Sequence, residues 1–174
     1  ANLEAGSEAT LEAGRNITLL AVEETNHYEE HSRSDGSLGR SKSHDLVHDE
    51  SGMLGTTIEV GNSESDQSTD LADSGKLVMS AGGDITLYAS QVVATGQADI
   101  TAGNNINVIA GINTISHSEK SSKEGVGTFS NNQNGYITQQ AIASGISAGG
   151  DLNLNAAKDI RLTASVLHSG QTLR

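Results

Sequence analysis

The sequence predicts an all-β fold, a right-handed parallel β-helix interrupted by two inserts, and three observations predict it. SAGGDITLYAS at residues 80–90 returns as SAGGDLNLNAA at residues 147–157, and a period of 21 residues relates residues 75–95 to residues 96–116. Within each repeat, apolar and polar residues alternate with the period of a β-strand. Gly and Asn precede these runs, and both tolerate the backbone angles of a tight corner. Strand and corner repeating about every 20 residues describe a β-helix.

The coil strands follow one another along the chain, each with two inward-facing aliphatic residues. In the 21-residue frame Ile85 matches Ile106 and Leu87 matches Val108. We expect the coils to stack about 4.8 Å apart, with like residues above one another. The predicted core residues are Ile17 and Leu19 in the first coil, Ile85, Leu87, Ile106 and Val108 in the middle, and Leu152 and Leu154 near the end, where a shorter repeat with Ile160 and Leu162 follows.

Glycines at the corners are predicted to let the backbone of one coil approach the next. Gly82, Gly103 and Gly149 each follow an alanine and precede a strand, and we expect them to turn the same corner in successive coils. Asp84 and Asp151 occupy matching positions in the two AGGD motifs. Their carboxylates are predicted to accept hydrogen bonds from nearby backbone N–H groups. The other predicted corner residues are Asn16, Asn104 and Asn105, whose side-chain amides can form a ladder.

One position of the repeat breaks the alternation. Leu20, Tyr88 and Ile109 fall on outward-facing positions although they are apolar. Because the coils stack, these three residues are expected to form an apolar ridge on the outer surface. The inserts are the candidates to pack on this ridge, above all the strand-like segment MLGTTIEVG at residues 53–61.

Two inserts, at about residues 23–74 and 116–144, interrupt the repeats. The first holds 13 acidic and 3 basic residues. Its polar half is predicted to form a two-stranded hairpin that turns near Asp35 and Gly36, or to be partly disordered. The second insert is rich in Ser, Asn and Gln. Three of the four aromatic residues of the chain lie in the inserts, which indicates that the inserts have packing of their own.

The composition argues against several function classes. The 174 residues include 22 acidic and 10 basic ones, a formal net charge of −12, whereas nucleic acid needs a basic surface. No run approaches the roughly 20 apolar residues of a membrane span. No signal peptide opens the chain, which begins in the middle of a repeat, so residues 1–174 are interpreted as a single β-helix segment excised from a larger protein. Cys is absent, which excludes a disulfide framework.

The candidate chemical sites each have a structural interpretation that we favour. His27 and His31, like His44 and His48, are four residues apart. That spacing suits a metal on a helix, but on a strand it separates the two residues by about 13 Å. The Gly-Gly-Asp motif at residues 82–84 lacks the third Gly and the nine-residue period of calcium-binding repeats. The acidic residues of the coils lie mostly at corners and are not clustered as in glycosidases. We expect no catalytic residue, metal or cofactor.

The stretch AGGDITLYASQVVATGQADITAGNNINVIAGINTISHSEKSS resembles the haemagglutinin repeats of filamentous haemagglutinin-like exoproteins, which include the long stick proteins of contact-dependent growth inhibition. HSEKSSKEGVGT at residues 117–128 is similar to the polar stretch of the more C-terminal class of these repeats, as is HYEEHSRS followed by SGMLGTTIEVG. The resemblance covers nearly the whole chain. It implies a rod at the bacterial cell surface, exported unfolded through an outer-membrane two-partner secretion transporter.

Three functions remain open from the sequence. The chain is a structural rod segment that supports adhesion or toxin delivery, or its inserts bind a receptor on a target cell, or it is a carbohydrate-active β-helix enzyme. The enzyme would require an acidic groove along one face. Unpaired strand edges on the terminal coils also predict end-to-end self-association of the chain.

Overall fold

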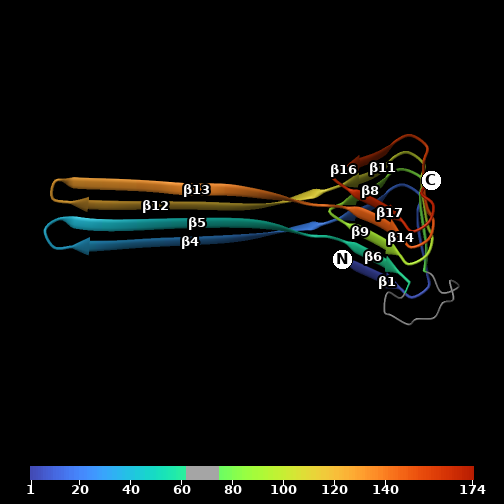
Figure 1. The fold of residues 1–174 in the computed structure, drawn as a ribbon, viewed down its shortest axis with the longest axis horizontal. Coiled ribbons are helices and arrows are strands. Elements are labelled where there is room, and N and C mark those ends of the chain that lie inside the picture. The colour runs from blue at the N-terminus through green and yellow to red at the C-terminus, as the bar shows by residue number, and fades with distance from the viewer. Residues whose placement is uncertain (62–74) are drawn as a thin grey trace. The chain divides into compact units, whose positions relative to one another are not determined.

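The computed structural model describes residues 1–61 and 75–174, and these residues form strands and no helix. They divide into two compact units. The first comprises Ala1–Val22, Leu54–Gly111 and Ala141–Arg174, and the second comprises Glu23–Met53 and Ile112–Gln140. Short parallel strands build the first unit, and long antiparallel strands build the second (Figure 1).

The first unit is a parallel β-helix made of three sheets. Sheet A contains, in spatial order, β1 (Asn2–Ala5), β6 (Thr57–Val60), β9 (Gln91–Ala94), β14 (Gly145–Ala148) and β17 (Val166–Ser169). Sheet B contains β2 (Glu8–Ala13), β7 (Lys76–Ala81), β10 (Ala98–Ala102) and β15 (Leu152–Ala156). Sheet C contains β3 (Ile17–Leu20), β8 (Ile85–Tyr88), β11 (Ile106–Ile109) and β16 (Ile160–Thr163). The chain visits the sheets in the order A, B, C, so each circuit adds one strand to every sheet.

The pairing register of sheet C places like residues in columns. Ile106 pairs with Ile85 and Val108 pairs with Leu87, which confirms the predicted offset of 21 residues. The columns continue in both directions, with Ile17 and Leu19 at one end and Ile160 and Leu162 at the other. Each column extends a ladder of backbone hydrogen bonds, and its side chains point to the same face.

The core of the β-helix is a narrow aliphatic layer between the three sheets. Ile85, Leu87, Ile106, Val108 and Leu152 are fully buried, and Leu19 is buried. Ile17 and Leu154 are only partly buried and pack against this core. Ile17 lies in β3 at the end of sheet C, where a neighbouring strand covers it from one side only. Leu154 lies in β15 at the end of sheet B, where the last residues of the chain bridge the other side.

The two AGGD motifs lie at different corners, and their predicted equivalence is wrong. Ala81 ends β7 of sheet B, whereas Ala148 ends β14 of sheet A. Gly82 and Gly103 therefore stack at the corner between sheets B and C, and Gly149 lies at the corner between sheets A and B. Both corners bring successive coils into backbone contact, so the same small residues suit each of them.

The shift of corner also changes the strands that follow. Leu152 and Leu154 pair with Ala98 and Ile100 in sheet B, and they are not the counterparts of Ile85 and Leu87. That place in sheet C belongs to β16, which the sequence shows only as a shorter repeat.

The first insert ends earlier than predicted. Residues 53–61 are predicted to cover the ridge, but Thr57–Val60 is β6, a strand of sheet A that pairs with β1 and β9. Ile58 and Val60 are each 1% exposed, because they alternate into the core like the residues of any coil strand. The remaining predicted insert residues, 62–74, lie outside the described residues.

The predicted ridge residues lie in line on sheet C. Leu20 pairs with Tyr88 and Tyr88 pairs with Ile109, at the ends of β3, β8 and β11. Leu20 is exposed, and Tyr88 and Ile109 are half-buried. That the inserts cover this ridge stays a prediction.

The second unit is built from two long hairpins. These are β4 (Val22–Gly36) with β5 (Arg40–Leu54), and β12 (Gly111–Gly125) with β13 (Thr128–Ile142). The second hairpin thus spans 111–142, beginning before the predicted residue 116. The order β13-β12-β5-β4, with β5 and β12 antiparallel, joins the hairpins into one sheet, called here the hairpin sheet (Figure 1). The first hairpin turns at residues 37–39, just beyond the predicted Asp35 and Gly36, and Leu38 and Gly39 have positive φ angles there.

Candidate functional site

Both hairpins interrupt the same connection of the β-helix, the turn that leads from sheet C to sheet A. The first hairpin stands between β3 and β6, and the second stands between β11 and β14. In the other two coils this connection is a short Ala-Ser turn, Ala89-Ser90 and Ala164-Ser165, whose alanines have φ angles of 46° and 47°. Coils with a hairpin therefore alternate with coils that have a tight turn.

A hydroxyl group holds this connection in every coil, a feature that the sequence prediction missed. The four residues, called here the turn hydroxyls, donate to the last carbonyl of the preceding sheet C strand. The bonds are Thr56 Oγ1 to Leu20 at 2.8 Å, Ser90 Oγ to Tyr88 at 2.8 Å, Ser144 Oγ to Ile109 at 2.6 Å and Ser165 Oγ to Thr163 at 2.8 Å. The four acceptors are aligned by the register of sheet C. The repeated Ala-Ser pairs at residues 89–90, 143–144 and 164–165 are the signal that could have revealed them.

The turn hydroxyls close the coil without using any residue of the hairpin strands. Ser90 and Ser144 are fully buried, and Ser144 Oγ also accepts the backbone N–H of Ser90 at 3.0 Å. A buried hydroxyl with its partners satisfied stabilises one local geometry, because breaking the bond would leave a buried polar group unpaired. The path of the coil is therefore set by the turn itself, and a hairpin is an addition to it.

Histidines of the hairpin sheet are paired with carboxylates on the neighbouring strand. His27 Nδ1 contacts the Asp49 carboxylate, and His31 Nδ1 lies 2.9 Å from Asp45 Oδ1. Both pairs connect β4 with β5. Glu29 lies between the two histidines on β4, with Oε1 2.9 Å from His31 Nε2. The spacing of two histidines four residues apart therefore serves cross-strand pairing.

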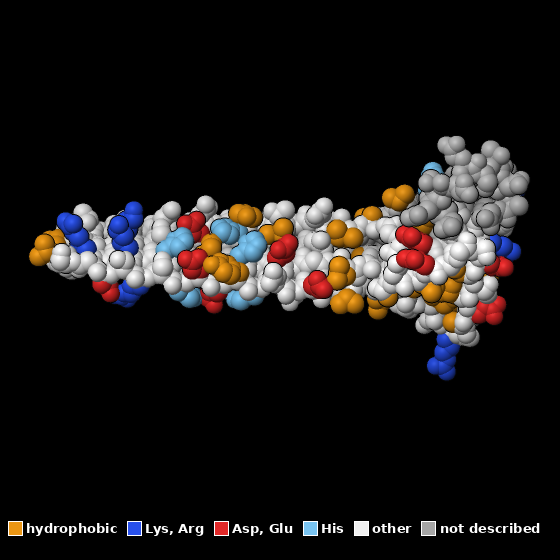
Figure 2. Space-filling model, turned by 90° about the horizontal axis from the view of Figure 1, so that it is seen from below, with side chains coloured by type: hydrophobic (Ala, Val, Ile, Leu, Met, Phe, Trp, Pro, Cys, Tyr) orange, Lys and Arg blue, Asp and Glu red, His pale blue; other side chains and the backbone are white. Residues whose placement is uncertain are grey.

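Histidine contacts also link β5 to β12 and β12 to β13. His44 Nδ1 on β5 lies 3.6 Å from Glu119 Oε1 on β12. His117 pairs with His48 across the same two strands, and its ring stacks on Tyr136 of β13 with centroids 5.1 Å apart. Figure 2 shows His and acidic side chains gathered midway along the hairpin sheet, with Lys and Arg toward its tips. Histidine contacts thus join every pair of neighbouring strands in this sheet.

The histidine pairs do not assemble into a metal site. In the part of the chain that the structure describes, no group of three His, Cys, Asp or Glu residues is placed to hold a metal ion. The carboxylates face the imidazole nitrogens directly, so the groups satisfy one another as hydrogen-bonded pairs.

The paired carboxylates raise the pKa of His27 and His31 above the ordinary value of 6.5, chiefly because they accept hydrogen bonds from the imidazole N–H groups, Asp49 from His27 and Asp45 from His31. A pKa raised by folding means that these pairs stabilise the hairpin fully below pH 6.5 and lose this contribution as the pH rises through the folded-state pKa. We expect NMR titration to place both midpoints above 6.5, and Asp49→Asn and Asp45→Asn each to lower the midpoint of its partner histidine. Added salt should weaken the effect, because the pairs are exposed.

The matched control for this titration is Asp35→Asn. Asp35 lies on the same hairpin, and its partner is Arg33 at 3.2 Å. The control is expected to leave both histidine midpoints in place. Midpoints at or below 6.5 in the unaltered chain would contradict the cross-strand pairing.

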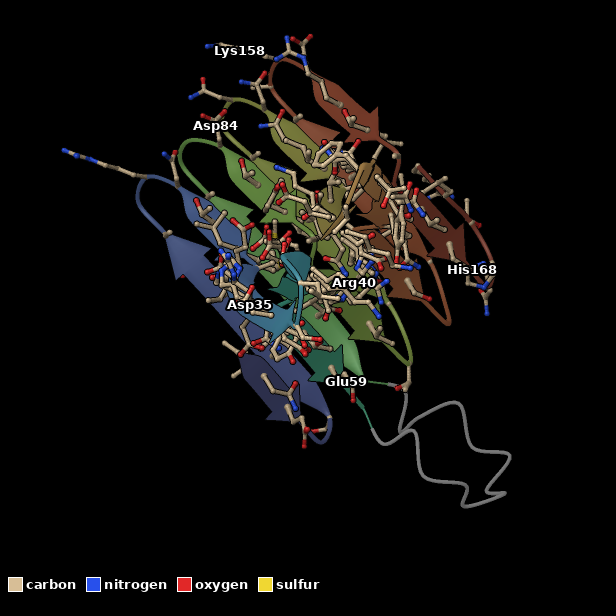
Figure 3. The ribbon with its side chains drawn as sticks, turned by 90° about the vertical axis from the view of Figure 1, so that its left-hand side faces the viewer. Asp35, Arg40, Glu59, Asp84, Lys158 and His168 are labelled. Carbon is tan, nitrogen blue, oxygen red and sulfur yellow. The ribbon has the colours of Figure 1, made fainter. Side chains whose placement is uncertain are left out.

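A ladder of Asn and Asp residues runs along the corner between sheets B and C. Asn16 Oδ1 accepts the N–H of Asp84 at 2.9 Å, Asp84 Oδ1 accepts the N–H of Asn105 at 3.0 Å, and Asn105 Oδ1 accepts the N–H of Asp159 at 3.3 Å. The predicted bond from a corner carboxylate to the backbone is confirmed. Asn105 lowers the pKa of Asp84 through its side-chain amide and its backbone N–H, and Lys158 adds to this effect. Figure 3 shows Asp84 and Lys158 on the same side of the coil stack.

Two other acidic residues of the coils, Asp151 and Asp99, are hydrogen-bonded at separate places. Asp151 accepts the N–H of Thr172 at 3.0 Å, at the corner between sheets A and B. Asp99 accepts the side-chain amide of Asn153 at 2.7 Å, within sheet B. Each carboxylate thus connects one coil to the next, which is a structural use of an acidic residue.

A groove of about 710 Å³ lies at the tips of the two hairpins. Arg40 and Lys42 of β5 and Lys123 of β12 line it, together with Phe129 of β13, and Glu124 also contributes. Although the chain is acidic overall, this groove combines three cationic groups with an exposed aromatic ring. That combination suits a ligand with anionic and apolar parts.

A family model described as hemagglutinin repeat matches residues 1–126, from the first coil to the tip of the second hairpin. The chain belongs to the hemagglutinin repeat family. The predicted resemblance is thereby confirmed. No curated protein and no solved structure matches the chain.

Members of the hemagglutinin repeat family are typically structural or adhesive proteins, and they are generally secreted surface exoproteins. The β-helix with its corner ladder agrees with a structural repeat of this family. Among residues 1–61 and 75–174, no helix is long and apolar enough to cross a membrane.

Proposed function

We propose that this chain forms part of the rod of a secreted exoprotein at the bacterial cell surface, and that the rod carries other parts of the protein toward a target cell for adhesion or for delivery of a toxin. The observation that supports the proposal most is the stacking of equivalent residues in sheet C, such as Ile85 on Ile106. A repeat that contacts only its neighbours can be extended without changing any coil, and rods are built in this way.

The proposed export route is passage of the unfolded chain through an outer-membrane two-partner secretion transporter. The chain has no Cys, so no disulfide forms before export. Each coil adds its own ladder of backbone bonds and a small core to the coil before it, so folding can proceed coil by coil once the strands emerge.

A second candidate function is favoured by the hairpin tips. In this proposal a receptor on a target cell binds in the groove lined by Arg40, Lys42 and Lys123. Phe129 and Ile137 of β13 are 73% and 72% exposed, and exposed apolar residues are frequent in binding sites. In this case the chain is an adhesin domain, and the β-helix serves as its support.

Removing both hairpins separates the two functions. Deleting residues 22–55 joins Ala21 to Thr56, and deleting residues 111–143 joins Ala110 to Ser144. The second junction reproduces the Ala89-Ser90 turn, and the first has Thr in place of the Ser. We expect the shortened chain to remain a folded β-helix, because the turn hydroxyls and the columns of sheet C are retained. Circular dichroism and thermal unfolding check the fold, and binding to a panel of bacterial cells checks the function.

A rod segment is expected to bind cells to the same small extent with and without its hairpins, whereas an adhesin domain should lose most of its binding. Arg40→Ser combined with Lys42→Ser and Lys123→Ser, in the intact chain, removes the cationic groove alone and tests it directly. If the shortened chain does not fold, the independence of the coils from the hairpins is wrong, and the rod proposal loses its main support.

A further inference from the structure

The hairpin sheet has two edge strands of equal length and very different chemistry. β4 and β13 each contain 15 residues and stand at opposite ends of the order β13-β12-β5-β4. An edge strand presents a row of backbone N–H and C=O groups to any other strand that can approach it. The side chains of an edge strand therefore determine whether another strand can pair with it.

The β4 edge is protected by charge. Its sequence, VEETNHYEEHSRSDG, holds five acidic residues and one arginine. Charged residues on an edge are a common protection against pairing, because another strand would have to bury or oppose them. Two copies of β4 would place like charges against each other.

The β13 edge has no such protection. Its sequence, TFSNNQNGYITQQAI, contains no Asp, Glu, Lys, Arg or His, and every residue except Ile142 at its end is exposed. Six of its residues are Asn or Gln, and their amides offer both a donor and an acceptor. Strands of this composition can pair with their own copy, because amides opposite amides find partners in either direction.

We propose that β13 is a strand-addition edge, and that its occupant is β13 of a second copy of this chain. Antiparallel pairing of two identical strands produces a two-fold axis, so the contact is closed and stops at two copies. The charged β4 strands then form both outer edges of the joined sheet, which prevents further growth. With a rise of about 3.4 Å per residue, 15 residues offer a ladder about 50 Å long. This inference is independent of the proposed function.

β13 is fixed to the hairpin sheet by its contact with β12, and its other face carries apolar side chains. Tyr136 is stacked on His117 of β12, so one face of the strand is tied to the sheet. Phe129 and Ile137 are separated from Tyr136 by odd numbers of residues and therefore point to the other face. Pairing centred on Gly135 places Phe129 opposite Ala141 and Ile137 opposite Gln133 of the second copy, which adds burial to the backbone bonds.

Sedimentation of the full chain over a range of concentrations tests the proposal. We expect the chain to associate into dimers, and two double variants, Q133K/I137K and Q133E/I137E, each to weaken the dimer by on the order of tenfold or more, because like charges meet across the two-fold axis. Mixing the two variants should restore association, since Lys on one copy then faces Glu on the other. Circular dichroism establishes that each variant keeps its strands.

The control is T25K/S32K, which adds the same charge at exposed positions of β4. It is expected to leave the dimer intact. A chain that stays monomeric up to its solubility limit would overturn the proposal, and β13 would then be free for a strand of another protein. Association that the β13 variants do not alter would also overturn it, and would indicate end-to-end stacking of the coils.

Discussion

Replacing Ile106 with alanine is expected to destabilise the β-helix by about 2–5 kcal/mol, the range for removing a large aliphatic side chain from a packed core. Ile106 is fully buried and lies between Ile85 and Ile160 in one column of sheet C. The coils on both sides hold the backbone in place, so the space left by the side chain cannot collapse. Because a domain is stable by only about 5–15 kcal/mol, the loss is a large fraction of the total.

Ile160→Ala is the matched control, because it makes the same chemical change at the end of the same column. Ile160 is 44% exposed and has a sheet neighbour on one side only. We expect a clearly smaller loss there. Denaturant unfolding followed by circular dichroism gives both free energies. Equal losses at the two positions would show that burial within the stack does not determine the stability of a coil.

Gly103→Ala is expected to cost about 1–3 kcal/mol or more, the range for forcing atoms into a packed site. A Cβ at this position would lie well inside contact distance of the Gly82 carbonyl oxygen in the coil below. That neighbour is backbone, and it is fixed by the hydrogen-bond ladder of the corner, where the N–H of Gly103 donates to Ala81. The strain therefore cannot be relieved by a side-chain movement, and the two coils must separate.

Gly14→Ala provides the comparison at the end of the same corner stack. Gly14 lies beneath Gly82, but no atom lies within 4 Å of the Cβ that alanine would add there. We expect a change near zero in the free energy of unfolding. If Gly103→Ala were as harmless as Gly14→Ala, the close approach of coils at this corner would not be what requires glycine.

Several features of the fold could be predicted because they depend on short segments. The alternation of Ile85 and Leu87 with polar residues specifies a strand with one buried face, and an offset of 21 residues to Ile106 specifies the length of one coil. The carboxylate of Asp84 was also expected to bond backbone groups. These are local properties, and a coil that contacts only its neighbours leaves little else to determine them.

The corner of each AGGD motif could not be predicted in the same way. Gly82 and Gly149 are both glycines followed by Gly-Asp, and both lie close to the backbone of the next coil. The corner between sheets A and B and the corner between sheets B and C both require a residue without a Cβ, because the backbone of the next coil is close. The same motif therefore fits either corner. Pairing partners alone distinguish the corners, and a pairing partner is a residue of another coil.

The bounds of the hairpins and the contacts of their histidines show the same distinction between local and long-range determinants. Alternation by itself could not show whether β6 covers the coils or belongs to them. The spacing of His27 and His31 was visible in the sequence, but their partners Asp49 and Asp45 are specified by the pairing of β4 with β5.

The sequence by itself determined the all-β repeat, the buried and exposed faces of the strands and the columns of inward-facing residues. Period-two alternation and coil length are both properties of a segment of about 20 residues. Only the tertiary structure decided which corner each glycine turns, where the hairpins leave the coils and which carboxylate meets which histidine. The physical reason is that each of these depends on register between segments far apart in the chain, and register is set by the joint fit of many side chains.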